Sequence, residues 1–293
     1  MIVKNELKAH LKELRLTIYL LNRNILVRIA SIIILALIVI AVLAPFIAPY
    51  PADALGATHP EISLSPMSAA HWFGTDELGR DIFSKIIYGT RISLSVAVVT
   101  IFFAVMIGAF LGAVAGSMSR WVDELIMRTT DTFLSFPPLL LAIALSAIMG
   151  PSLANAQIAI IASWWPWYTR LMRGQAVSVR EKPFVMAAEA IGTGHLTIIF
   201  KHIVPNCIAP ILVQASMDMG GVILTVAALS FLGLGAQPPT PEWGLMVSTS
   251  KNYFLNAWWY GVFPGIAIFI TVLSFNLIGD GLREVLDPKT RKN

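Results

Sequence analysis

The sequence predicts an all-α, polytopic membrane protein with six transmembrane helices. Of its 293 residues, 56% are hydrophobic and 13% are charged, and the mean hydropathy is +0.73. Soluble domains carry about 25% charged residues, so a soluble fold is excluded. Several long stretches hold few or no charges, and a helix needs roughly 20 apolar residues to cross a bilayer. Finally, the basic residues fall unevenly between these stretches.

The uncharged stretches set the number of spans. The stretch over 132–169 is too long for one crossing, and its centre reads Met149-Gly150-Pro151-Ser152, which is typical of a turn. We therefore expect a tight helical hairpin there. The six spans are expected near 27–48, 92–117, 132–149, 154–171, 207–230 and 257–280.

Charge orients these spans. If both termini lie in the cytoplasm, 17 of the 21 Lys and Arg residues are inside, and only Arg80, Lys85, Arg91 and Lys251 are outside. The positive-inside rule favours this arrangement. It also explains the pI of about 9.3, so no nucleic-acid partner is expected.

The predicted organisation follows the spans. Residues 1–26 form a cytoplasmic interfacial helix with apolar residues on one face, and residues 27–48 form the first transmembrane helix. Residues 49–91 form an extracytoplasmic loop that contains an amphipathic helix. A five-helix core spans 92–285 and includes a cytoplasmic loop over 173–206, and residues 286–293 form a cytoplasmic tail.

The outer loop contains the clearest helix signal outside the spans. Thr75 can cap a helix whose first turn holds Asp76 and Glu77, at the positive end of the helix dipole. Leu78 and Ile82 share one face of that helix. The segment is either a surface that meets an external partner or an ordinary amphipathic linker.

Glycines mark the second span. Gly108, Gly112 and Gly116 repeat every four residues, a pattern that lets another helix backbone approach closely. Between the fifth and sixth spans, residues 230–259 combine glycine, proline and aromatic residues. This composition is typical of a re-entrant or capping loop.

The cytoplasmic loop is predicted to be a helix, a glycine corner and a second helix. Pro183 fits a first helical turn, and Phe184, Ala187, Ala188 and Ile191 give one apolar face. Gly192 and Gly194 permit the left-handed turn that ends the helix. The second helix, 195–202, should end before Pro205. A plain connection between helices is commonly 2–8 residues long, so the length favours a docking element.

This loop resembles the EAA loop of permease subunits in binding-protein-dependent ABC importers. Ala187, Ala188, Gly192, Val204 and Pro205 match its spacing, whereas Met186 replaces its first Glu and His202 its Ile. The resemblance covers nearly all of 20–288. The segments HWFGTDELGRDIFS, MRTTDTFLSFPPLLLAI, LSFLGLGAQPPTPEWG and NLIGDGLREVLDP look like the second permease subunit of dipeptide, oligopeptide and nickel importers.

The resemblance implies a type I ABC importer transmembrane domain in a prokaryotic cytoplasmic membrane. It further implies a second homologous permease subunit, two cytoplasmic ATPase subunits that bind ATP and Mg, and an extracytoplasmic substrate-binding protein. The EAA loop is the coupling helix that meets the ATPase. Its expected contact residues here are Phe184, Ala187, Ala188, Glu189, Gly192 and Pro205.

The chain shows no chemistry of its own. It lacks the G-x-x-x-x-G-K-[ST] nucleotide-binding pattern, and its five histidines lack metal-ligand spacing, so we expect neither a catalytic site nor a bound cofactor or metal. Asp218, with Gln214 one turn before it, is a carboxylate within the fifth span. Such a group faces either a translocation pathway or another helix, and both alternatives stay open.

The sequence therefore predicts a non-catalytic permease subunit that carries peptides. The same importer class carrying nickel or a metal chelate is the alternative. An ion-coupled secondary transporter would show internal repeats and more intramembrane ionisable groups, and an intramembrane enzyme would show a nucleophile beside a base. The sequence shows none of these.

Overall fold

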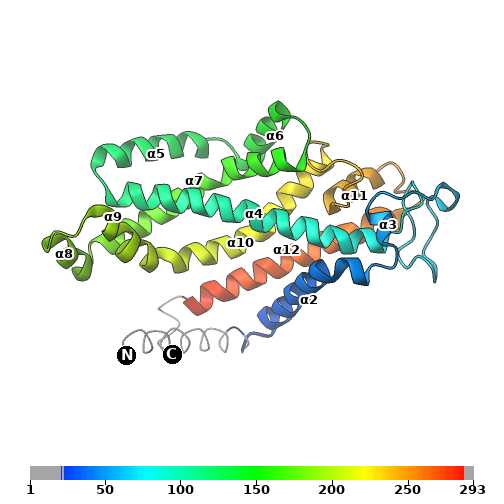
Figure 1. The fold of residues 1–293 in the computed structure, drawn as a ribbon, viewed down its shortest axis with the longest axis horizontal. Helices are drawn as coiled ribbons and strands as arrows, with labels where there is room; N and C mark the ends of the chain where they lie inside the picture. Colours follow the sequence, from blue (N-terminus) through cyan, green and yellow to red (C-terminus); the bar gives the residue numbers. More distant parts are fainter. Residues whose placement is uncertain (1–20, 22, 287–293) are drawn as a thin grey trace.

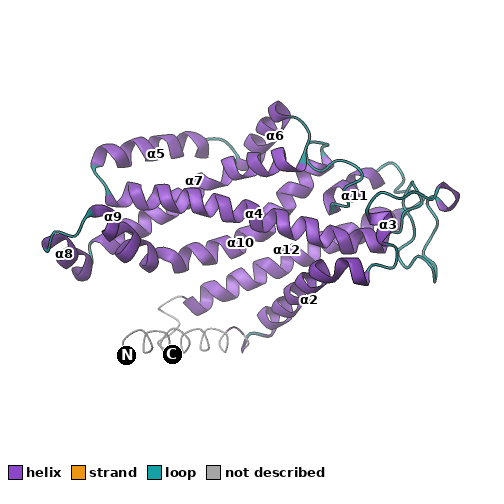
Figure 2. Cartoon of the chain, viewed as in Figure 1, coloured by secondary structure: helices purple, strands orange, loops and turns teal. Residues whose placement is uncertain are grey.

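The computed structural model describes residue 21 and residues 23–286. Most of the predicted interfacial helix over 1–26 and nearly all of the tail over 286–293 lie outside the described residues. Within the described range the chain is helical and contains no β-strand (Figure 2), which confirms the all-α class.

The helices form an elongated bundle (Figure 1). The long helices α4, α7, α10 and α12 lie against one another, while α8 and α9 lie at one end and α3 with the 48–81 loops at the other. Their bounds are α2 Ile25–Ile47, α3 Pro51–Ala54, η1 Pro60–Ile62, α4 Ile82–Ser117, α5 Arg120–Leu134, α6 Pro138–Met149, α7 Leu153–Arg180, α8 Pro183–Ala190, α9 His195–Ile198, η2 Ile199–Ile203, α10 Val204–Phe231, α11 Trp243–Ser250 and α12 Trp258–Leu286.

Four helical segments are long and apolar enough to cross a membrane: Ile25–Ile47, Ile82–Ser117, His195–Phe231 and Trp259–Val285. The bent pair α5–α6 makes a fifth if it counts as one span. The expected span over 154–171 lies within α7, which is not among these segments and which continues to Arg180 past Arg170 and Arg173. Six crossings therefore remain a prediction.

The segment of the expected span over 132–149 is not one continuous helix. α5 ends at Leu134 and α6 begins at Pro138, with an 86° bend between them. Pro137 and Pro138 lack backbone N–H groups, so the helical hydrogen bonds cannot continue through them. The hairpin turn is where the sequence places it, because α6 ends at Met149 and the Ser152 side chain caps α7 by accepting from the Asn155 amide (3.0 Å).

The glycine repeat allows the close helix approach that was predicted, and the partner of α4 is α7. A Cβ on Gly108 would lie 2.5 Å from the Tyr168 Cβ, and one on Gly116 would lie 2.7 Å from the Ala176 Cβ. Only glycine fits at these positions because the two backbones nearly touch.

The predicted helix starting at Thr75 is absent. Residues 75–81 form a turn, and α4 begins at Ile82 with Asp81 as its cap. The reason lies in Asp76, whose Oδ1 accepts from the amides of Leu78 and Arg80 (2.9 Å each) and so holds the backbone in a turn. The continuous helix α4 also includes Arg91, so no break in the helix marks the expected boundary between outer loop and span at 91/92, which stays a prediction.

Candidate functional site

The 183–203 segment is a helical corner at one end of the bundle (Figure 1). α8 begins at Pro183 and ends at Ala190, and Gly192 follows with φ +80°. The Gly192 amide donates to the Glu189 carbonyl (3.0 Å) and the Thr193 amide to the Ala188 carbonyl (3.1 Å), which caps the helix. The left-handed corner predicted at Gly192 is therefore confirmed.

The second half of this segment differs from the prediction. α9 does not end before Pro205 but continues through a π-helical turn, Ile199–Ile203, into α10. Pro205 lies in the first turn of α10, where its missing N–H costs little. The widened turn lets one continuous helix pass a proline that would otherwise break it.

The two faces of α8 have different roles. Val185 and Ala188 are buried, with exposed fractions of 0% and 7%, whereas Phe184, Ala187 and Ile191 are exposed. Ala188 therefore does not lie on the free face, which corrects the sequence-based expectation. The reason is geometric: Val185 and Ala188 are three residues apart and point into the bundle together.

The buried face ties α8 to the long helices. Val185 belongs to a hydrophobic cluster with residues of α4, α7, α9, η2 and α10, namely Ala104, Ala113, Tyr168, Met172, Ala176, Val179, Ile198, Ile199, Ile203, Cys207 and Ile211. Glu189 adds an ion pair to Arg180 at the end of α7 (3.6 Å). A force applied to α8 would reach the long helices α4, α7 and α10 through this cluster.

The exposed side of the same segment carries five large apolar side chains, beside charged ones such as Lys182 and Lys201. Phe184, Met186, Ile191, Leu196 and Phe200 are 42%, 58%, 82%, 66% and 57% exposed. Such a gathering at the tip of a protein marks an interaction surface.

Asp218 makes contacts inside the bundle. Its Oδ2 accepts from the hydroxyl of Tyr168 (2.7 Å), a fully buried residue of α7, and its Oδ1 accepts from Gln214 Nε2 (2.9 Å). Each carboxylate oxygen thus has a partner, and the bond to Tyr168 joins α10 to α7. This geometry supports the helix-to-helix alternative left open by the sequence.

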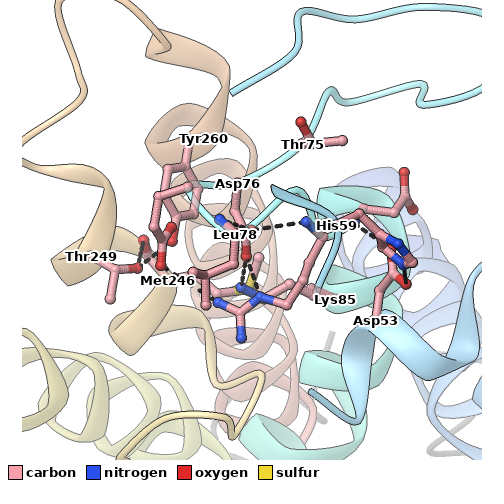
Figure 3. Close-up of polar contacts among 12 residues, drawn as sticks. Asp53, His59, Thr75, Asp76, Leu78, Lys85, Met246, Thr249 and Tyr260 are labelled. Atoms are coloured by element: carbon pink, nitrogen blue, oxygen red, sulfur yellow. Dashed lines mark hydrogen bonds and ion pairs between the residues drawn. The ribbon is translucent and has the colours of Figure 1, made fainter. Parts of the chain in front are cut away.

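A buried cluster of charged side chains lies at the end of the bundle opposite α8 (Figure 3) and was not predicted. Asp76 is 0% exposed, and its Oδ2 accepts from Arg80 Nε (2.7 Å) and Lys85 Nζ (2.6 Å). Burial raises the pKa of Asp76, but the charges of Lys85 and Arg80 outweigh burial and hold that pKa below its usual value of 3.8. The four-residue spacing of Asp76 and Arg80 is visible in the sequence, but the same spacing also suits an ion pair on a helix, so it does not distinguish the turn from a helix.

Neighbouring contacts fix the surrounding chain. Asp53 Oδ2 accepts from the Asp81 amide (2.8 Å), and Asp53 Oδ1 lies 3.2 Å from His59 Nε2. His71 Nδ1 lies 3.0 Å from Asp81 Oδ1. Among the described residues no group of three or more His, Cys, Asp or Glu side chains is placed to hold a metal ion.

The loop between α10 and α12 closes over this end. Trp243 of α11 is buried and donates from Nε1 to the Ile86 carbonyl of α4 (3.1 Å). Glu242 caps α11 by accepting from the amides of Gly244 and Leu245 (2.9 Å each). Burial raises the pKa of Glu242 although these hydrogen bonds oppose the rise. We call this end, residues 49–91 and 232–260, the cap.

Comparisons with known proteins agree on a family. Residues 108–292 match the family model described as binding-protein-dependent transport system inner membrane component. Residues 14–66 match the N-terminal TM domain of oligopeptide transport permease C.

Similar curated proteins cover nearly the whole chain. The dipeptide transport system permease protein DppC of Alkalihalophilus pseudofirmus is 49% identical over 92% of this chain and 88% of its own length. The probable D,D-dipeptide transport system permease protein DdpC of Escherichia coli is 44% identical over 93% and 90%. The glutathione transport system permease protein GsiD of Pectobacterium atrosepticum is 44% identical over 89% and 86%.

A solved structure shares the fold. One chain of the inward-facing MetNI methionine ABC transporter superposes with a TM-score of 0.55 at 18% identity, covering 69% of this chain and 96% of its own. At this identity the likeness concerns the fold alone.

Proposed function

The chain belongs to the family of binding-protein-dependent transport system inner membrane components, and from that premise we propose that it is the permease subunit of an ATP-driven peptide importer. The named cargoes of its relatives, dipeptides, D,D-dipeptides and glutathione, are all short peptides. Short peptides are therefore the proposed cargo. The chain itself gates and lines the path, and ATP hydrolysis is the task of partner chains.

The proposed assembly contains a second homologous permease, two cytoplasmic ATPase subunits with bound ATP and Mg, and an extracytoplasmic binding protein at the cap. The chain crosses the membrane six times. Two of these crossings, α7 and the bent pair α5–α6, are not single helices that length and hydropathy alone identify as spans. Both termini lie in the cytoplasm. This orientation rests on the distribution of basic residues.

The corner at Gly192 is the observation that carries the coupling role. It presents Phe184, Ala187 and Ile191 outward while Val185 stays in the cluster shared with the long helices. When the ATPase subunits close, α8 moves with them. Since its buried face belongs to a cluster shared with α7 and α10, the movement passes to the spanning helices and switches the path between its inward and outward openings.

Two matched glycines test this role. Gly192 has φ +80° and Gly194 has φ −62°, and a Cβ on either would meet nothing within 4 Å. Gly192→Val therefore introduces backbone strain of about 1–2 kcal/mol without a clash, whereas Gly194→Val introduces neither. We expect Gly192→Val to weaken ATPase binding, or the coupling of hydrolysis to uptake, about tenfold in proteoliposomes. Gly194→Val should match the wild type.

Ala187→Asp provides a second perturbation. It places a charge on the exposed face, where a docked ATPase would desolvate it, so binding should fall. Wild-type ATPase binding, hydrolysis and uptake in both Gly192→Val and Ala187→Asp would show that the segment is a plain connection.

The cargo is tested separately in wild-type vesicles that carry the whole transporter and its binding protein. Uptake of a labelled dipeptide should be inhibited by unlabelled dipeptides or glutathione. Uptake of nickel or a metal chelate with no competition from peptides would favour the alternative cargo.

A further inference from the structure

The helix α5 carries a polar face that nothing above explains. α5 is fixed to α7 by the Arg173–Asp123 pair, with Nε–Oδ1 and Nη2–Oδ2 distances of 2.5 and 2.6 Å, and by Arg170 Nη2 to Asp131 Oδ1 (2.6 Å). Figure 1 shows α5 along one edge of the bundle beside α7 and α4. The first half of α5 exposes apolar side chains as well as charged ones, with Trp121 and Leu125 at 84% and 71%. From Arg128 onward the exposed residues are Arg128, Thr129, Asp131 and Thr132, followed by Ser135 just after the helix, and we call these five the polar face.

The depth of this face in the membrane follows from its contact with α7 and from the contact of α7 with α4. Arg170, which holds Asp131, directly follows Thr169 of α7, and Thr169 lies against Gly108 and Gly112 of α4. At this level the outer face of α4 is apolar, with Phe103, Met106, Ile107 and Phe110 exposed. In a multi-pass membrane protein such a face meets lipid acyl chains. The polar face of α5 therefore lies at lipid depth.

Lipid cannot be the neighbour of that face. Asp131 and Arg170 are each 53% exposed, and charged side chains are costly in a hydrocarbon environment. The backbone also breaks between α5 and α6, and irregular backbone at membrane depth requires protein or water beside it. By contrast, the exposed face of α2 presents Ile, Leu, Val and Phe side chains.

The charged side chains favour water over protein. Thr129 donates to the Leu125 carbonyl (3.0 Å), Thr132 to the Arg128 carbonyl (2.9 Å), and Ser135 to the Thr132 carbonyl (2.7 Å). The buried hydroxyls of Thr130 and Ser163 make the same bonds, so the hydroxyl groups fit either neighbour. Charged residues, however, are depleted from the cores of protein interfaces.

We propose that the polar face of α5, with the Arg170–Asp131 pair, lines the aqueous path and contacts the charged ends of the cargo. This inference rests on the proposed function. A half-exposed guanidinium beside a half-exposed carboxylate matches a zwitterion, whose carboxylate and ammonium groups would find opposite charges close together. The less exposed Arg173–Asp123 pair, at 35% and 26%, fastens α5 to α7 instead.

Aqueous access is tested independently of cargo. In the assembled transporter in membranes, with the buried Cys207 replaced by Ser, Thr132→Cys and Ile107→Cys are treated with a charged methanethiosulfonate reagent. Thiols react as thiolates and need water. We expect Thr132→Cys to react at least about 100-fold faster than Ile107→Cys, and a saturating dipeptide to slow its reaction.

Two results would overturn the lining role. Equal, slow reaction of both cysteines would place α5 against lipid. Reaction of Thr132→Cys in the isolated chain but not in the assembly, with or without dipeptide, would place α5 in a subunit interface.

Peptides with blocked ends test the charge contact. Arg170→Gln should lower uptake of a dipeptide with a free carboxylate about tenfold, and change uptake of its C-terminal amide much less. Arg170→Lys should restore the preference for the dipeptide with a free carboxylate over its amide. Arg173→Gln should lower uptake of both peptides equally. Equal losses of both peptides in Arg170→Gln overturn the cargo contact. If wild-type vesicles take up no peptide while Thr132→Cys still reacts, the proposed cargo fails and the aqueous lining stands.

Discussion

Removal of the Asp76 carboxylate should open the cap while the helical bundle stays folded. Asp76 accepts four hydrogen bonds, from the amides of Leu78 and Arg80 and from the charged groups of Arg80 and Lys85. Arg80 and Lys85 are only 5% and 4% exposed. In Asp76→Ala both cations stay buried without their shared anion.

The size of the effect follows from this burial. Breaking a buried ion pair costs about 3–5 kcal/mol because the remaining charge is uncompensated. Glu77 lies 3.5 Å from Arg80 and is 21% exposed, so it compensates in part and places the loss near 3 kcal/mol. Since about 1.4 kcal/mol is tenfold, the open form of the cap should become roughly 100-fold more populated.

Limited proteolysis from the cap side of reconstituted vesicles measures this population. Asp76→Ala should be cut roughly 100-fold faster than the wild type, while Glu61→Ala, at a 70% exposed carboxylate of the same segment, should change the rate less than about twofold. Replacing Lys85 by Met in the Asp76→Ala chain should restore part of the protection. Equal cutting of Asp76→Ala and Glu61→Ala would refute the reasoning.

Acid should mimic the substitution. Because the pKa of Asp76 is lower in the folded cap than its usual 3.8, the unfolded chain binds a proton more readily. The stabilisation is complete above that value and is lost as pH falls through the lower folded pKa. Cleavage of the wild type should therefore accelerate below about pH 4, and cleavage of Asp76→Ala should accelerate less.

Substitutions at three further positions test other contacts. Gly112→Leu should separate α4 from α7, at about 1–3 kcal/mol in thermal unfolding, whereas Gly174→Leu, where a Cβ meets nothing within 4 Å, should be tolerated. Burial raises the pKa of Glu242, so its ionisation weakens the folded state as pH rises above 4.5; Glu242→Gln should remove this pH dependence, and Glu242→Ala should lose about 1 kcal/mol of capping. Asp218→Asn should keep the bond from Tyr168 and change uptake less than about twofold; an altered cargo preference would instead place Asp218 in the pathway.

Sequence patterns predicted the features that local chemistry decides. Glycine spacing predicted a close helix contact of α4, though not that α7 is the partner, and Gly150 and Gly192 marked turns whose φ values are +88° and +80°. These predictions succeeded because a missing Cβ has the same consequence in every context.

Predictions that depended on competition between local and distant contacts were wrong. The acids after Thr75 suited a helix start, but Asp76 binds the backbone of its own turn and two cations, one of them from α4. Similarly, Ala188 matched an exposed docking motif, yet it is buried because the apolar side of α8 packs on the bundle. Sequence periodicity shows which residues share the apolar face of a helix, but it does not show whether that face packs on the bundle or on a partner.

The contacts among the long helices suggest how the cap communicates with α8 at the other end of the bundle. α4 runs unbroken from the cap, where Asp81 begins it, to the level of Ala113, which shares a cluster with Val185 of α8. Close glycine contacts lock α4 to α7, so these two helices should move as one body. α5 is joined to that body by the Arg170–Asp131 and Arg173–Asp123 ion pairs and by the edge contact of Phe133 with Trp165, whose ring centroids lie 5.4 Å apart. A displacement of α8 that reaches α7 should therefore also move the polar face of α5.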